Sequence, residues 1–172
     1  MTAHHGNLDL EFEHRNGRTE LIHSKFHVPL QCFRPYYFDS YGRAYVYILT
    51  PTGGIVSGDR LDINVHLGPN CKVFLTTQAA TKVYKTLGKP SQQSLHCVIE
   101  ENSSFEYFPD HVILFNNADY EQYSDITLHP GATMIFADLF SAGRLTRGEK
   151  FQFSRFKNNI HIHNNTHSII LD

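Results

Sequence analysis

The stretch NVHLGPNCKVFLTT, residues Asn64–Thr77, has the same layout as two later stretches of the chain. In each, an alternating apolar run leads into a tight turn and a small residue, and a second alternating run follows. The later stretches are HCVIEENSSFEYFP (His96–Pro109) and DITLHPGATMIFAD (Asp125–Asp138). Alternation with a period of two predicts β-strands with one buried face. The chain therefore repeats a strand–turn–strand unit.

The turn positions of the three units are Asn70, Asn102 and Gly131. They are spaced 102 − 70 = 32 and 131 − 102 = 29 residues apart. Asn and Gly tolerate a positive φ, so we expect the same left-handed turn at all three positions. A period near 30 favours a mostly β fold, a layered β-helix-like stack of paired strands with about 30-residue coils. The alternative is an ordinary sandwich with similar hairpins.

The rest of the chain also has the pattern of strands, and helical periodicity is nearly absent. Further alternating runs cover Leu8–His14, Tyr45–Leu49 and Leu61–Leu67, and Asn16-Gly17 predicts a hairpin after the first of them. No linker, charge block or low-complexity tract interrupts residues 1–172. We therefore expect a single β domain with few or no helices.

Composition excludes several classes of function. The 172 residues carry a formal net charge of -2, so nucleic acid is not an expected partner. No apolar run approaches the length of a membrane span, and the N-terminus is polar, so we expect a cytoplasmic protein without membrane contact. Cys32, Cys71 and Cys97 lack metal-site spacing, which predicts reduced, buried or half-buried thiols.

The stretch TPTGGIVSGDR (Thr50–Arg60) has the glycine spacing of a phosphate-binding loop. Such a loop requires a Lys after its last glycine and a helix behind it. Here Asp59 follows Gly58, and an alternating strand comes next. We therefore expect no nucleotide site. Gly53, Gly54 and Gly58 instead predict a tight connection between strands with unusual φ/ψ.

Four stretches of this chain resemble the urease accessory protein family called UreD, or UreH in some bacteria. They are the Pro-x-Gly-Gly-x-x-x-Gly-Asp core (Pro51–Asp59), TTQAATKVYK (Thr76–Lys85), FEYFPDHVILFNNADYEQ (Phe105–Gln122) and GATMIFADLFSAGRLTRGEKF (Gly131–Phe151). Members of this family are typically longer. The resemblance therefore leads us to expect that the family's C-terminal part is missing after Asp172.

The resemblance implies a non-catalytic scaffold for urease maturation. Such proteins join the accessory protein UreF and the GTPase UreG on the urease apoprotein, and together they deliver Ni²⁺ to its active site. The family fold is mostly β with layered strands, and a polar internal tunnel has been proposed as the nickel path. The implied cofactor content is none tightly bound, with transient Ni²⁺ only.

Two carboxylates are candidates for contact with metal in transit. Asp59 follows Gly58, and Asp138 lies shortly before Gly143, so each belongs to a glycine-containing motif. Carboxylate oxygens hold divalent ions weakly, as a transit path requires. The alternative for Asp59 is a turn residue that bonds to its own backbone.

A second metal candidate is the pair His161 and His163, which share one face of the expected strand in NNIHIHNNTH (Asn158–His167). This spacing suits Ni²⁺ or Zn²⁺. The alternative is a polar, exposed edge strand, because no acid accompanies the pair in the sequence. The chain has no GxSxG or HExxH motif, so we expect no enzymatic activity. The competing hypothesis is a small β-barrel or cupin-like metalloenzyme that uses His161, His163 and a carboxylate.

Overall fold

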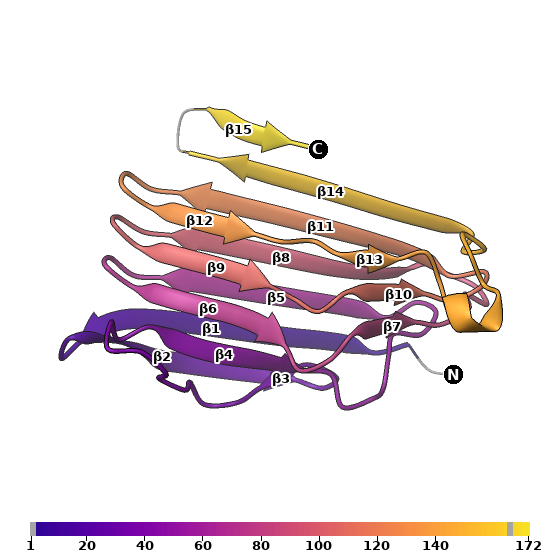
Figure 1. Ribbon diagram of the computed structural model, residues 1–172, viewed down its shortest axis with the longest axis horizontal. Helices are drawn as coiled ribbons and strands as arrows, with labels where there is room; N and C mark the ends of the chain where they lie inside the picture. The colour runs from indigo at the N-terminus through magenta and orange to yellow at the C-terminus, as the bar shows by residue number, and fades with distance from the viewer. Residues whose placement is uncertain (1–2, 165–166) are drawn as a thin grey trace.

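The computed structural model describes residues 3–164 and 167–172 and consists of three β-sheets, of which the five-stranded and the three-stranded sheet follow one another in front of the seven-stranded sheet (Figure 1). The seven-stranded sheet has the order β15-β14-β11-β8-β5-β1-β2. Its strands are β15 (Ser168–Leu171), β14 (Arg155–His163), β11 (Asp119–Leu128), β8 (Ser91–Ile99), β5 (Arg60–Leu67), β1 (His5–Arg15) and β2 (Arg18–His27). The five-stranded sheet contains β12 (Thr133–Phe136), β9 (Ser104–Phe108), β6 (Lys72–Thr77), β4 (Ala44–Leu49) and β3 (Gln31–Cys32). The three-stranded sheet contains β13 (Phe140–Ser141), β10 (Val112–Leu114) and β7 (Thr81–Val83).

The chain winds through the three sheets in successive coils. The coil β5–β6–β7 is followed by β8–β9–β10 and then by β11–β12–β13, and each strand pairs in parallel with its counterpart in the next coil. Lys72 of β6 pairs with Ser104 of β9, and Ser104 pairs with Thr133 of β12. These offsets are 104 − 72 = 32 and 133 − 104 = 29 residues, the spacings of the sequence repeat. The predicted stack of about 30-residue coils is confirmed, with a short third strand in each coil that the sequence did not reveal.

The three predicted turns are also confirmed. Asn70, Asn102 and Gly131 have φ values of 60°, 56° and 73°. The turns lie one above another, because the Asn70 N–H donates to the Glu101 carbonyl and the Asn102 N–H to the Pro130 carbonyl. The residues that form the turns therefore also set the register between successive coils.

Antiparallel pairs of strands lie at both ends of the seven-stranded sheet. At one end β1 and β2 form a hairpin through Asn16-Gly17, both with positive φ, as predicted. At the other end β15 pairs with β14. Within the described residues the only helical element is the three-residue η1 (Leu145–Arg147). No helix in this part of the chain is long and apolar enough to cross a membrane.

The hydrophobic core lies between the sheets. Leu61, Ile63, Val65 and Leu67 point from β5 into it, as their alternation predicts, and each is at most 2 % exposed. The opposite face of the seven-stranded sheet is polar. Fully burying a Leu or Ile side chain stabilises a fold by about 1.5–3 kcal/mol, so this alternation alone fixes which face turns inward. The core cluster includes residues of all three sheets.

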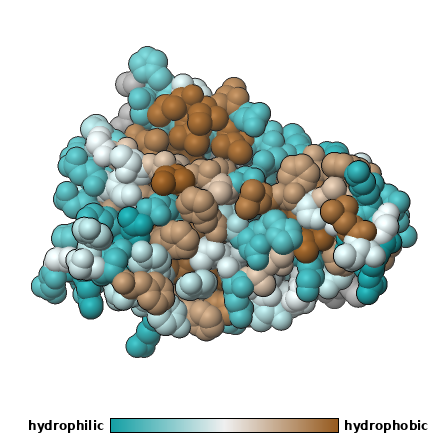
Figure 2. Space-filling model, viewed as in Figure 1, coloured by the Kyte–Doolittle hydropathy of each residue, from teal (hydrophilic) through white to brown (hydrophobic). Residues whose placement is uncertain are grey.

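An apolar edge remains on the surface at β15. Ile169, Ile170 and Leu171 are exposed, and Figure 2 shows hydrophobic side chains gathered over this end of the stack. The sheets are thus open, with edge strands at β15 and β2. An open stack contradicts the barrel or cupin-like fold on which the metalloenzyme hypothesis rested.

Candidate functional site

The glycine-rich stretch Thr50–Arg60 forms a corner of the stack. Ile55 bridges in parallel to Val83, with its N–H donating to the Lys82 carbonyl, so the stretch runs beside β7. Gly54 makes this approach possible, because a Cβ there would lie 2.7 Å from the Lys82 carbonyl oxygen. The stretch then leads directly into strand β5. This is the predicted strand connection, and the helix that a phosphate-binding loop requires is absent from this described segment.

Asp59 lies buried at the end of this stretch, with 2 % of its surface exposed. One carboxylate oxygen accepts a hydrogen bond from the backbone N–H of Val56 at 2.9 Å, and the other accepts from the N–H of His4 at 2.8 Å. The first bond is the one that the turn alternative requires. The second fastens the start of β1 to the loop. Both oxygens are thus engaged with the backbone, and the metal role of Asp59 stays a prediction.

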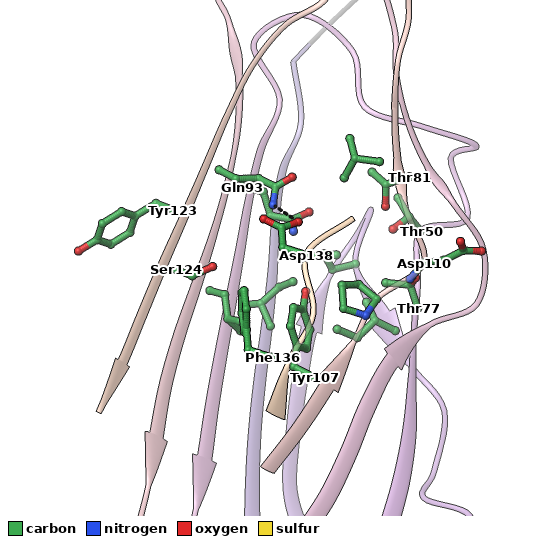
Figure 3. Close-up of a pocket in the computed structure, with 17 residues that line it drawn as sticks. Thr50, Thr77, Thr81, Gln93, Tyr107, Asp110, Tyr123, Ser124, Phe136 and Asp138 are labelled. Carbon is green, nitrogen blue, oxygen red and sulfur yellow. Dashed lines mark hydrogen bonds between the residues drawn. The ribbon is translucent and has the colours of Figure 1, made fainter. Parts of the chain in front are cut away.

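Asp138 lies between the sheets, two residues after β12, and its carboxylate points toward the inner face of the seven-stranded sheet (Figure 3). One oxygen accepts a hydrogen bond from Asn158 Nδ2 at 2.6 Å, and the other accepts from Gln122 Nε2 at 3.5 Å. Gln122 and Asn158 are register partners on β11 and β14. The carboxylate is therefore held by two amides from two different coils.

Three buried polar atoms around Asp138 have no hydrogen-bond partner among the described residues. They are Gln122 Oε1, Asn158 Oδ1 and the hydroxyl of Tyr120. A buried polar group without a partner costs about 1–3 kcal/mol, so such groups are expected to bind water or an ion. Both amides turn their NH₂ groups to Asp138, so rotation of either amide would place an oxygen beside the carboxylate instead. Carboxylate and amide oxygens are hard ligands of the kind that bind a cation weakly.

Two buried phenols border the same region. Burial raises the pKa of Tyr107, and the negative charge of Asp138 raises it further. Burial also raises the pKa of Tyr120 well above its usual value, with smaller contributions from Tyr107 and Asp138. Both phenols therefore stay protonated at neutral pH. In Figure 3 the Tyr107 hydroxyl points toward Asp138. Because both phenols are neutral, the Asp138 carboxylate is the negative charge of this interior cluster.

Asp138, Gln122 and Tyr107 line a small cavity of about 30 Å³. That volume holds about two water molecules or one ion. Short polar side chains from β6, from β7 and from the segments after β4 and before β10 also line the cavity (Figure 3): Thr77, Thr81, Thr50 and Asp110. We call Asp138, Gln122, Asn158, Tyr107 and Tyr120 the interior polar cluster.

His161 and His163 lie on the outer face of β14, away from the interior polar cluster. Their neighbour is Asp125 on β11, whose Oδ1 is 3.1 Å from His161 Nδ1. The structure places His161 and His163 side by side but not together with Asp59. Asp59 precedes the first residue of β5, whereas His163 ends β14, so they lie at opposite ends of the parallel strands.

The sequence analysis did not identify the side chains that contact Asp138, nor the carboxylate beside His161 and His163. No local pattern in the stretches that contain Gln122 and Asn158 links either residue to Asp138, and Asp125 is 36 residues from His161. The offset between coils could have found them, because it brings β11 and β14 side by side with Gln122 opposite Asn158 and Asp125 opposite His161. The repeat recognised in the sequence ends at Asp138. It therefore does not include β14, whose pairing with β11 brings these residues together.

Comparison with known proteins identifies the family. The family described as UreD urease accessory protein matches residues 4–172. "Urease accessory protein UreD 2" of Streptomyces griseus is 40% identical over 159 residues, which cover 91% of this chain and 54% of that protein. "Urease accessory protein UreD" of Trichormus variabilis is 36% identical over 158 residues, with coverage of 92% and 57%.

A third relative, "Urease accessory protein UreD" of Lachnoclostridium phytofermentans, is 31% identical over 172 residues, which is 100% of this chain and 63% of the relative. The chain thus spans little more than half the length of the curated relatives it matches. The family match covers both the glycine-rich corner and the interior polar cluster. On this evidence the chain belongs to the UreD family of urease accessory proteins.

Proposed function

We propose that this chain is a non-catalytic scaffold for urease maturation, which joins UreF and UreG on the urease apoprotein and assists the delivery of Ni²⁺. Membership of the UreD family supports the role in urease maturation. The specific partners follow from the resemblance of the sequence to that family. Nickel is the cargo in this proposal, and the chain contacts it only in passing.

The observation that carries the metal role is the interior polar cluster. Between the sheets, a carboxylate accepts from two buried amides whose oxygens have no hydrogen-bond partner among the described residues, and Asp138 and Gln122 line a cavity of about 30 Å³. A purely structural core would favour apolar side chains here, because unsatisfied buried oxygens destabilise the fold. Oxygen ligands of this kind suit brief contact with a divalent ion better than tight retention.

The cluster also has the electrostatics of a cation path. The two phenols are neutral, and the Asp138 carboxylate supplies the negative charge. Attraction between this carboxylate and a divalent cation is strengthened in a site of low dielectric constant. Because the amides of Gln122 and Asn158 can rotate, their oxygens can replace water around an ion and then release it.

Co-purification tests the scaffold role. The tagged chain is co-expressed with UreF, UreG and the urease apoprotein, and the captured proteins are identified together with urease activity. We expect all three partners to be retained and urease to be activated only when the chain is present. Full activation in its absence, or no capture of any of the three, would contradict the proposal.

A further inference from the structure

On the outer face of the seven-stranded sheet, three side chains of the types that bind metal ions lie close together. None of them belongs to the interior polar cluster. His161 and His163 project from β14, and Asp125 projects from the adjacent parallel strand β11. One candidate ligand atom from each residue lies within 4.8 Å of the other two. The side chains are 32 %, 26 % and 33 % exposed, so they are fixed by the sheet and still open to solvent.

Two of the three separations match those of ligands that share one metal ion. Asp125 Oδ1 is 3.1 Å from His161 Nδ1 and 3.4 Å from His163 Nε2. With metal–ligand bonds near 2.0–2.1 Å, two ligands lie about 2.9 Å apart at a right angle and about 3.4 Å apart at the tetrahedral angle. The Asp125 oxygen and either imidazole nitrogen therefore require little movement to share an ion, and the two imidazole nitrogens lie within 4.8 Å of each other.

The hydrogen bonds of His163 also favour a metal site. Its Nδ1 is 3.3 Å from the backbone carbonyl of Asn164, which can only accept, so Nδ1 carries the hydrogen in this bond. In the neutral ring Nε2 then presents a lone pair toward the Asp125 carboxylate, which is also an acceptor. A bound cation removes this conflict. A histidine that donates one ring N–H to a backbone carbonyl and offers the other nitrogen is a common arrangement of a metal ligand.

A simple hydrogen-bonded group is the competing explanation. The Thr127 hydroxyl, 3.3 Å from His163 Nε2, can donate to it, and His161 can donate to Asp125. The rings of His161 and His163 also stack with centroids 4.6 Å apart. These contacts account for the geometry of the side chains without an ion, so a direct binding measurement is needed.

We propose that Asp125, His161 and His163 bind one divalent transition metal ion of the Ni²⁺ and Zn²⁺ class on the outer face of the sheet. Two imidazoles favour such ions over Mg²⁺ and Ca²⁺, which prefer oxygen ligands alone. Three protein ligands on an open face leave further positions to water, so the ion is exchangeable. This site is separate from the interior polar cluster and does not depend on any role in urease maturation.

Calorimetric titration of the whole chain with NiCl₂, in buffer containing excess MgCl₂, tests the site. We expect binding at this site to weaken at least about tenfold in each of His161→Gln, His163→Gln and Asp125→Asn. The matched control is His66→Gln, because His66 is an exposed histidine on the same face of the sheet, paired with Glu100 and separated from β11 by β8. It should bind Ni²⁺ as the unchanged chain does.

Circular dichroism of each variant establishes that the fold is intact before binding is compared. Because all three side chains lie on the outer face, at least the conservative Asp125→Asn variant is expected to fold. Equal affinity and stoichiometry for the unchanged chain and the folded variants would overturn the proposal. Loss of binding in the His66→Gln control to the same extent would also overturn it, since binding would then follow histidine content and not this site.

Discussion

Replacement of Gly131 by Ala tests how closely the coils are stacked. Gly131 has a φ of 73°, and a Cβ built there would overlap Oδ1 of Asn102 in the preceding coil. The left-handed backbone costs an alanine about 1–2 kcal/mol. Turning Asn102 out of its rotamer adds about 0.5–1.5 kcal/mol, and the lower entropy of the unfolded alanine chain offsets about 0.4–1 kcal/mol. We expect a net destabilisation of about 2 kcal/mol.

Gly17→Ala is the matched control for this prediction. Gly17 has a φ of 80° in the β1–β2 hairpin, and a Cβ there would meet no heavy atom within 4 Å. The Gly17→Ala variant therefore loses about 1 kcal/mol of stability through its backbone conformation alone, without any overlap between coils. The difference between the two variants, measured by urea unfolding, isolates the contact with Asn102.

A double variant completes the test. Asn102→Gly removes the overlapping oxygen and suits the φ of 56° at that position. Combined with Gly131→Ala, it should recover most of the difference between the Gly131 and Gly17 variants, since adjacent sites couple in a double-mutant cycle. If Gly131→Ala were no more destabilising than Gly17→Ala, the contact between stacked turns would contribute nothing and the reasoning would fail.

Three further predictions follow from the loop, its carboxylate and the thiols. Asp59→Asn should lower the free energy of unfolding by about 1–3 kcal/mol, because one amide oxygen cannot accept from both backbone N–H groups; a denaturation curve unchanged from that of the unchanged chain would contradict this. The loop Gly53–Gly58 should bind neither GTP nor ATP, and saturable calorimetric binding of GTP–Mg²⁺ tighter than about 100 μM would refute that expectation. In the native chain a disulfide-exchange reagent should label Cys32 alone, since burial raises the pKa of Cys71 to about 11 and raises that of Cys97 further; rapid labelling of either buried thiol would show that the core is open.

The stack could be predicted from the sequence because its code is local. Asn70, Asn102 and Gly131 mark turns through their own φ preference, and alternation marks the strands between them. The division of each coil among three sheets could not be predicted, because β7, β10 and β13 are only two or three residues long. Such short strands exist through pairing with their neighbours and leave no periodic pattern.

The candidate sites were less predictable than the fold. The hydrogen bond from the Val56 N–H to Asp59 joins residues close in sequence, and it corresponds to the turn alternative given for Asp59, because an aspartate commonly accepts a hydrogen bond from its own turn. The bond from His4 to the same carboxylate spans 55 residues and depends on where β1 joins the sheet. Likewise, Asp125 completes the histidine pair only through the register of β11 against β14, which no local pattern encodes.

The central claim, that Ni²⁺ passes the interior polar cluster, is tested most directly by the nickel content of urease matured with Asp138→Asn. The substitution removes the charge and keeps the shape, because rotation of the Gln122 or Asn158 amide can present its partnerless oxygen to the new NH₂ group. Asp9→Asn is the control, since Asp9 also accepts from two side-chain amides, those of Asn7 and Asn64, but on the outer face.

Both variants should fold and should capture UreF, UreG and the urease apoprotein as the unchanged chain does. At limiting Ni²⁺, metal analysis of the purified urease should show about tenfold less nickel with Asp138→Asn, and unchanged nickel with Asp9→Asn. Full nickel loading of urease by a folded, partner-binding Asp138→Asn variant would contradict the account.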